Sequence, residues 1–251
     1  MSIGTTWHDA GSVGLGRAGA DTQTGPYRER NEDYALIDPD LPLALVLDGM
    51  GGAGGELAAR VGAEAIRDRV RAGFANNEAP ETLLEAALRA GQAAVLRLHA
   101  NPDLRGCGST VGAAWIHGNR VYVTWLGDSP AFRVSAGQLK RLTWAHDVRN
   151  ALVRAGIITE ANAADYRIRN VLTHYLGSSD ECPHEIPSFA PFPGDRLVLT
   201  TDGVSNFLHE ETILTACQTI SDPTTCAEAI VEHALMAGSR DNCTCAVIAF
   251  D

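Results

Sequence analysis

The stretch that decides the fold is Leu43-Ala44-Leu45-Val46-Leu47-Asp48-Gly49-Met50-Gly51-Gly52, where an unbroken apolar run leads into an aspartate and a glycine-rich turn. A short continuous apolar run is typical of a β-strand that is covered on both faces. The Asp48-Gly49 step has ordinary turn chemistry. We therefore expect a buried strand over residues 43–47 that ends in a carboxylate at one edge of its sheet.

Helices and further strands are expected on both sides of this strand. Apolar residues recur at helical spacing over 55–74 and 79–100. Asp222 before Pro223 is a typical helix start. The other expected elements are strand pairs over 109–117 with 121–126 and 132–134 with 139–142, a strand over 196–201, helices over 210–220 and 223–237, and a closing strand over 243–250. These elements predict an α+β fold, a four-layer α-β-β-α sandwich of two antiparallel sheets flanked by helix pairs, as a single domain over residues 1–251.

Composition excludes several classes of protein. The chain has 251 residues and a formal net charge of −11, which argues against nucleic acid as the main partner. No apolar run reaches the ~18 residues of a membrane helix, and residues 1–16 lack a secretory signal pattern, so we expect a cytoplasmic protein without membrane contact. The six cysteines form no Cys-x-x-Cys pair and are expected to be small buried hydrophobes.

Acidic residues stand at the ends of the apolar runs. Asp48, Asp128, Asp202 and Asp241 each lie beside one run, and Glu32-Asp33 precedes another. Any one of them is an ordinary turn residue. If these ends meet at one rim of the sheets, however, their charges repel one another unless a cation neutralises them. Oxygen ligands of this kind select hard ions such as Mg²⁺ or Mn²⁺.

A carboxylate pocket of this kind suits phosphoryl hydrolysis. Two divalent ions about 3.5–4 Å apart can supply a nucleophile near neutral pH and stabilise in-line attack at phosphorus. The phosphate also needs a fork of charged donors, which arginine provides. Arg28 lies just before the Glu32-Asp33 pair and is the candidate, and the alternative is a solvated surface arginine like Arg30.

The ordered motifs resemble those of bacterial metal-dependent serine/threonine protein phosphatases of the type 2C class. They extend from about residue 25 to the end of the chain. The motifs, in chain order, are Gly25-Pro26-Tyr27-Arg28-Glu29-Arg30-Asn31-Glu32-Asp33, Asp48-Gly49-Met50-Gly51-Gly52, Gly108-Ser109-Thr110, Gly127-Asp128-Ser129, Thr143 with His146, Thr201-Asp202-Gly203 and Asp241-Asn242-Cys243-Thr244.

The resemblance implies a role for each candidate residue. Asp48 would bridge two manganese or magnesium ions, and the Gly49 carbonyl would join one of them. Asp202 and Asp241 would hold the other ion. Glu32 and Asp33 would orient ligands from outside, Arg28 would bind the substrate phosphate, and Asp128 would serve a weaker third ion.

The sequence departs from the family pattern at three positions. Pro130 stands where the family commonly has arginine after Gly-Asp-Ser, and Ala145 stands where it commonly has aspartate before His146. Met50 replaces the histidine that animal members carry as a proposed general acid. These departures leave substrate docking and the proton donor for the leaving group open.

Residues 147–170 correspond to a flap segment beside the site in bacterial members. Its cationic residues, Arg149, Arg154, Arg167 and Arg169, either contact substrate or form a solvated face. His146, beside it, is expected to be a hydrogen-bonded structural residue rather than a metal ligand.

The function predicted is that of a metal-dependent phosphatase acting on phosphoserine and phosphothreonine in proteins. A non-catalytic adaptor of the same fold and a phosphatase for small phosphate esters are the alternatives. We expect phosphoprotein partners, among them a serine/threonine kinase and its substrates, and a monomer.

Overall fold

The computed structural model describes residues 1–7, 16–163, 171–178 and 185–250. Strand β4 (Leu43–Met50) contains the predicted apolar run and continues through Asp48 and Gly49. Leucines 43, 45 and 47 pack toward helices, whereas Ala44 and Val46 pack toward the opposite sheet. The strand is apolar on both faces because each face meets a different layer.

Two antiparallel sheets face each other. The first has the order β1-β2-β12-β11-β8-β9, and the second has the order β10-β7-β6-β4-β3, with β5 paired to β4. The strands of the first sheet are β1 (Ser2–Trp7), β2 (Gly16–Gln23), β12 (Cys243–Ala249), β11 (Arg196–Thr200), β8 (Ala131–Ser135) and β9 (Gln138–Arg141). Those of the second, besides β4, are β10 (Ser188–Phe189), β7 (Arg120–Leu126), β6 (Val111–His117), β3 (Asp33–Ile37) and β5 (Gly108–Ser109).

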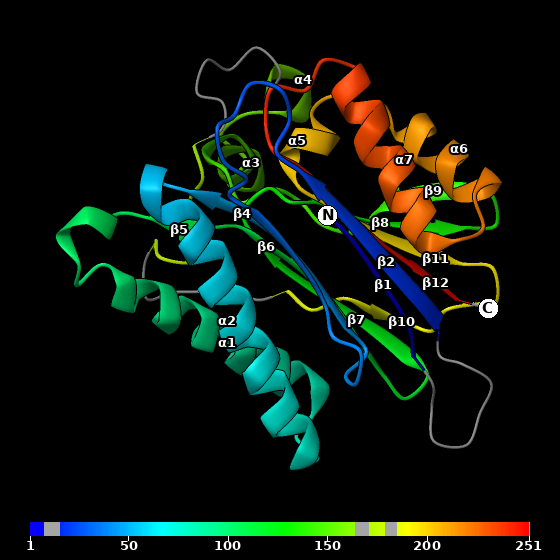
Figure 1. The fold of residues 1–251 in the computed structure, drawn as a ribbon, viewed down its shortest axis with the longest axis horizontal. Coiled ribbons are helices and arrows are strands. Elements are labelled where there is room, and N and C mark those ends of the chain that lie inside the picture. Colours follow the sequence, from blue (N-terminus) through cyan, green and yellow to red (C-terminus); the bar gives the residue numbers. More distant parts are fainter. Residues whose placement is uncertain (8–15, 164–170, 179–184, 251) are drawn as a thin grey trace.

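Helix pairs cover the outer faces of both sheets. Helices α1 (Gly55–Ala75) and α2 (Pro80–Leu98) lie on the sheet that contains β4, and α6 (Glu210–Thr219) and α7 (Pro223–Met236) lie on the other sheet (Figure 1). Buried side chains accordingly form three clusters, one under each helix pair and one between the sheets. This confirms the predicted four-layer α-β-β-α sandwich.

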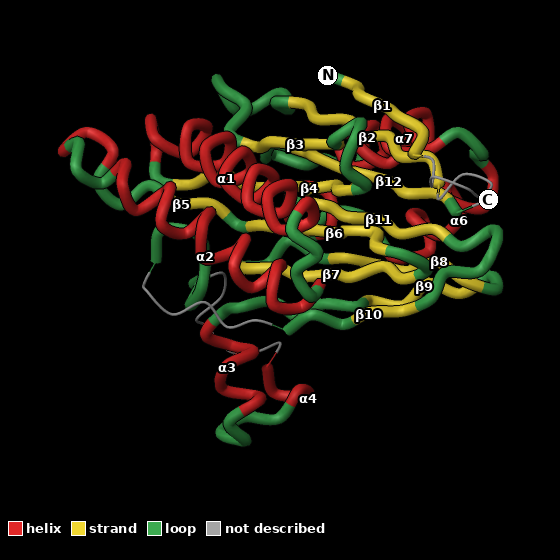
Figure 2. Tube along the Cα trace, turned by 90° about the horizontal axis from the view of Figure 1, so that it is seen from below, coloured by secondary structure: helices red, strands yellow, loops and turns green. Residues whose placement is uncertain are grey.

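Smaller elements connect these layers. The helices are α3 (Val148–Arg154), α4 (Glu160–Ala163) and α5 (Asp202–Ser205), with 3₁₀ turns η1 (Gly52–Gly54) and η2 (Pro102–Leu104). Helices α3 and α4 project from one side of the sandwich (Figure 2) and form the described part of the predicted flap segment. Arg167 and Arg169 lie outside the described residues.

The predicted helices agree with the structure to within two residues at each end, and Asp222 caps α7 by accepting a hydrogen bond from the Thr225 amide at 2.8 Å. Strands β1 and β2 were not predicted. The β2 sequence, Gly-Arg-Ala-Gly-Ala-Asp-Thr-Gln, has a single β-branched residue, Thr22, and no clear alternation. The strand exists because β12 pairs with it along its length. Cys107, Cys217, Cys226, Cys243 and Cys245 are buried thiols as expected, and Cys182 lies outside the described residues.

Among the helices that the structure describes, none combines the length and the apolar character needed to cross a membrane.

Candidate metal centre

One pocket gathers most of the predicted site residues. It has a volume of about 590 Å³ and lies at the edge of the sheets where β4 ends. The predicted residues that line it are Arg28, Glu32, Asp48, Gly49, Asp128, Asp202 and Asp241. Segments from five parts of the sequence therefore meet at one rim, as the positions of the carboxylates indicated.

Asp48 lies near the end of β4, where hydrogen bonds of its backbone hold it in place. Its amide donates a hydrogen bond to Thr110 Oγ1 at 3.0 Å, and its carbonyl accepts from the Thr110 amide at 2.9 Å. The Thr110 hydroxyl is bonded in turn to Ser129 Oγ at 2.7 Å. Burial, followed by repulsion from Asp33, Asp202, Asp128 and Asp241, raises the pKa of the Asp48 carboxyl well above its usual range.

Asp33 lies beneath the pocket rather than in its lining. It pairs with Asp48 across β3 and β4, and its Oδ2 accepts hydrogen bonds from Thr201 Oγ1 at 2.8 Å and Thr244 Oγ1 at 2.7 Å. Burial raises its pKa to about 7 in spite of these two donors. The position suits a residue that orients the carboxylates above it and does not itself face solvent.

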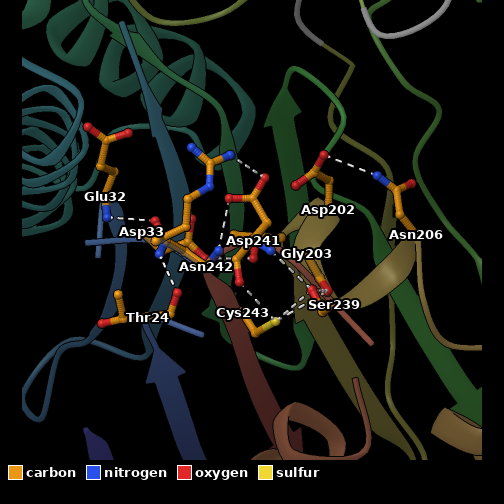
Figure 3. Close-up of polar contacts among 12 residues, drawn as sticks. Thr24, Glu32, Asp33, Asp202, Gly203, Asn206, Ser239, Asp241, Asn242 and Cys243 are labelled. Carbon is orange, nitrogen blue, oxygen red and sulfur yellow. Dashed lines mark hydrogen bonds and ion pairs between the residues drawn. The ribbon is translucent and has the colours of Figure 1, made fainter. Parts of the chain in front are cut away.

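Asp202 and Asp241 come from neighbouring strands. Asp202 follows β11 and begins α5, and Asp241 precedes β12. Figure 3 shows their carboxyl groups side by side, pointing to the same side. Asp202 accepts from Asn206 Nδ2 at 3.1 Å. Burial, followed by repulsion from Asp241, raises the pKa of Asp202, while a hydrogen bond with the Asp48 side chain acts in the opposite direction.

Arg28 contacts this acidic group directly. Its guanidinium donates to Asp241 Oδ2 at 2.7 Å, and about half of its side chain is exposed. The hydrogen bond with Asp241 is the main reason that the pKa of Arg28 is raised. Arg28 is therefore held in the pocket by Asp241 and is not simply a solvated surface residue.

Asp128 lies just after the end of β7, next to Gly127, and lines the pocket. Burial, followed by repulsion from Asp202, raises its pKa to about 6. The guanidinium of Arg141 on β9 acts in the opposite direction.

Two glycines allow the backbones at the rim to approach closely. A Cβ at Gly49 would overlap the carbonyl oxygens of Gly55 and Glu32, and one at Gly203 would overlap the carbonyl oxygen of Asn242. The Gly49 amide donates to the Glu32 carbonyl at 3.1 Å, which fixes the loop that carries Glu32 against the end of β4. Glycine is thus required at both positions by contact distance.

Asn242 is a site residue that sequence reasoning did not single out. Its Oδ1 accepts from the Glu32 amide at 2.8 Å, and its Nδ2 donates to the carbonyls of Thr24 at 2.8 Å and Arg30 at 3.0 Å. Asn242 therefore ties the loop that carries Arg28 to the turn before β12 that carries Asp241. Its place within an Asp-Asn-Cys-Thr motif was the available signal.

The pocket also has an apolar wall that the sequence did not reveal. Val171, Leu172 and Tyr175, which follow the flap segment, are part of its lining. Met50 lies in the same lining and cannot donate a proton.

His146 has a structural role, as predicted. It is buried, its Nδ1 accepts from the Gly127 amide at 3.2 Å, and its ring stacks on Trp125 at 5.7 Å between centroids. Burial lowers its pKa to about 4, so the ring is neutral at pH 7. His146 thus supports the turn that carries Asp128.

The donor set of the pocket fits hard divalent cations. The carboxylates raise one another's pKa values, which is the electrostatic condition that a cation relieves. Within the described ranges, no three acidic, histidine or cysteine side chains lie in an arrangement that could hold a metal ion by themselves. Water or substrate would therefore have to complete the coordination of an ion in this pocket.

Comparison with known proteins agrees with this geometry. The family model for protein phosphatase 2C matches residues 28–235. The serine/threonine protein phosphatase PstP of Mycobacterium tuberculosis is 34% identical over 236 residues, which is 92% of this chain and 44% of PstP. The chain thus spans a little under half the length of this curated relative.

Solved structures show the same architecture. The PPM Ser-Thr phosphatase MsPP of Mycobacterium smegmatis, in complex with cacodylate, has a TM-score of 0.79 at 31% identity, covering 93% of this chain and 98% of that one. The catalytic domain of PstP with two manganese ions has a TM-score of 0.78 at 30% identity, covering 93% and 97%. Because the family model spans most of the sequence, this chain belongs to the protein phosphatase 2C family.

Proposed function

We propose that this protein hydrolyses phosphoserine and phosphothreonine in proteins with the help of two divalent ions. The observation that carries the proposal is one pocket in which mutually repelling carboxylates adjoin the guanidinium of Arg28. The names of its relatives support the same activity, since they are serine/threonine protein phosphatases.

The carboxylates have distinct places in this proposal. Asp48 is central, since its pKa responds to four other acidic residues, and it would bridge the two ions with the Gly49 carbonyl beside it. Asp202 and Asp241 would hold the second ion, and Asp128 a weaker third. Glu32 and the buried Asp33 would orient this group from outside. Two manganese or magnesium ions held there would provide hydroxide near neutral pH and neutralise charge on the phosphoryl group.

Arg28 would position the substrate. Its guanidinium already lies 2.7 Å from Asp241, so neutralisation of that carboxylate by a cation would free the donors for a phosphate. A guanidinium can grip two phosphate oxygens at once, which fixes the phosphorus for in-line attack. Val171, Leu172 and Tyr175 would offer apolar contacts to a bound substrate.

A non-catalytic adaptor is the weaker alternative. Such a protein has no need to keep this set of carboxylates at one rim, where their repulsion costs stability. The full set of predicted ligands together with Arg28 favours the enzyme.

Partners and location follow as parts of the same proposal. The partners would be phosphoproteins, a serine/threonine kinase and its targets, and the protein would act as a monomer. The cytoplasm is supported by the described cysteines, which are buried free thiols of the kind kept in a reducing compartment.

The test is hydrolysis of a phosphothreonine peptide by the full chain with Mn²⁺, with Mg²⁺ and with excess chelator. Activity should require an added ion, and Asp202→Asn should lose most of it while remaining folded. Asp103→Asn, at an exposed position in η2, serves as the matched control. Metal should also raise the melting temperature, because an ion at 100 times its Kd adds about 2.7 kcal/mol. Full activity in chelator would refute the two-metal proposal.

A further inference from the structure

A second pocket adjoins the candidate metal centre. It has a volume of about 560 Å³ and shares Arg28, Asp202 and Asp241 with the first pocket. A substrate whose phosphate lies at Arg28 can therefore extend into this second space without leaving the surface. The part of the pocket beyond the shared wall is lined by Gly203, Asn206, Phe207, Arg149 and Arg240.

Two of these residues are arginines from different parts of the fold. Arg149 comes from α3 in the flap segment, and Arg240 comes from the turn before β12. Arg149 lies 3.8 Å from Asp147 Oδ2, which is a long contact, and Asp147 Oδ1 caps α3 by accepting from the Asn150 amide. Within the described part of the chain, Arg240 makes no ion pair, and its guanidinium lies over the Tyr27 ring at 5.4 Å from the centroid.

The lining of this second pocket differs in charge from the protein as a whole. The chain carries a net charge of −11, yet the three arginines in the lining of this space outnumber its two aspartates, and Arg149 and Arg240 line the part beyond the shared wall. Guanidinium groups bind carboxylates and phosphates with fixed geometry. Phe207, whose side chain lies in the same lining and is 37% exposed, adds an apolar contact for the stem of a bound side chain.

We propose that Arg149 and Arg240 form a subsite, the arginine pocket, that binds an acidic side chain close in sequence to the phosphorylated residue of the substrate. The proposal rests on the phosphatase activity proposed above and names its preferred substrate: an acidic phosphopeptide. The anionic group is a carboxylate of aspartate or glutamate or a second phosphate.

The arrangement of the two pockets sets the sequence distance. An extended peptide advances about 3.3–3.6 Å per residue, and its side chains alternate in direction. A side chain one or two residues from the phosphorylated residue therefore reaches a pocket that shares a wall with the phosphate site. Because Arg149 lies on the flap segment and Arg240 on the sandwich, such a side chain would also link these two parts.

The experiment measures kcat/KM with Mn²⁺ for a set of phosphothreonine peptides. Glutamate, alanine or lysine is placed singly at each of the two positions before and after the phosphothreonine, and a further arm carries phosphoserine instead. Each variant is scored by its ratio of kcat/KM for the acidic peptide to that for the alanine peptide. The variants are Arg149→Gln, Arg240→Gln, the double variant and Arg240→Glu. Lys140→Gln, at an exposed position on β9, is the matched control for loss of one positive charge.

At one position or more, the wild type should favour glutamate over alanine by roughly five-fold, the size expected of partly exposed ion pairs. The double variant should bring this ratio close to one, Lys140→Gln should keep it, and Arg240→Glu should favour lysine. The preference should also weaken as salt rises. The phosphoserine arm decides whether the doubly charged phosphate is favoured over the carboxylate.

Three results would overturn the inference, and they show which proposal fails. Equal hydrolysis of all peptides by the wild type, or an acidic preference that survives in the double variant, would refute the arginine pocket alone. Failure of the wild type to hydrolyse any phosphopeptide with either metal would refute the proposed function and the inference with it.

Discussion

Replacement of Asp128 by asparagine should stabilise the metal-free protein above pH 6. Burial and the charge of Asp202 raise the pKa of Asp128 from 3.8 to about 6. One pKa unit corresponds to about 1.4 kcal/mol, so keeping this carboxylate charged costs the fold on the order of 3 kcal/mol. Asparagine has nearly the same shape and no charge, and it avoids this cost. The corresponding rise in melting temperature is roughly 5–10 °C for a chain of this size.

The pH dependence of this gain has a definite sign. The folded protein keeps a proton on Asp128 up to about pH 6, whereas the unfolded chain releases it near 3.8. The wild type therefore loses stability as the pH rises through this interval. The advantage of Asp128→Asn should be complete above pH 6 and should shrink as the pH falls toward 4.

The assay is urea unfolding in chelator at pH 7.5 and pH 4.5, with Asp103→Asn as the exposed control. A series with Mn²⁺ tests the proposed third ion, because a wild type that binds it should regain stability relative to the variant at high metal concentration. A wild type as stable as Asp128→Asn in chelator at pH 7.5 would show that this carboxylate carries no electrostatic cost, and the reasoning would fail.

Three further predictions concern single residues. Arg28→Ala should lower kcat/KM on a phosphothreonine peptide by a factor on the order of 10²–10³. Arg28→Lys should restore only part of this activity, because ammonium lacks the paired donors of guanidinium. Wild-type kinetics in Arg28→Ala would contradict the role in phosphate binding. The wild type should lose stability relative to His146→Gln as the pH falls from 6.5 toward 4. Folding lowers the pKa of His146 to about 4, so the unfolded chain takes up the proton first. A difference in the free energy of unfolding in urea that stays constant with pH would contradict this. Gly203→Ala should destabilise the fold by about 1–3 kcal/mol, since its Cβ would overlap the Asn242 carbonyl, and an unchanged thermal midpoint would argue against that contact.

Much of the fold was predictable because its elements carry strong local signals. The apolar run over 43–47, the two long periodic segments after it and the Asp222-Pro223 helix start each specify local structure through burial or capping, and all are confirmed. Strand β2 was missed because its glycines and alanines have no pattern of their own. Pairing with β12, more than 200 residues away in sequence, creates it.

The candidate site divides in the same way. The sequence by itself determined which residue types stand at the strand ends, and so the carboxylates, Arg28 and the motif order. Only the tertiary structure decided that Asp33 lies beneath the pocket while Asp48 faces it, that Asn242 ties the loop of Arg28 to β12, and that Arg149 and Arg240 share a second pocket. The physical reason is that burial, repulsion between carboxylates and side-chain hydrogen bonds depend on distances across the sandwich, which join residues far apart in the chain and leave no local pattern in the sequence.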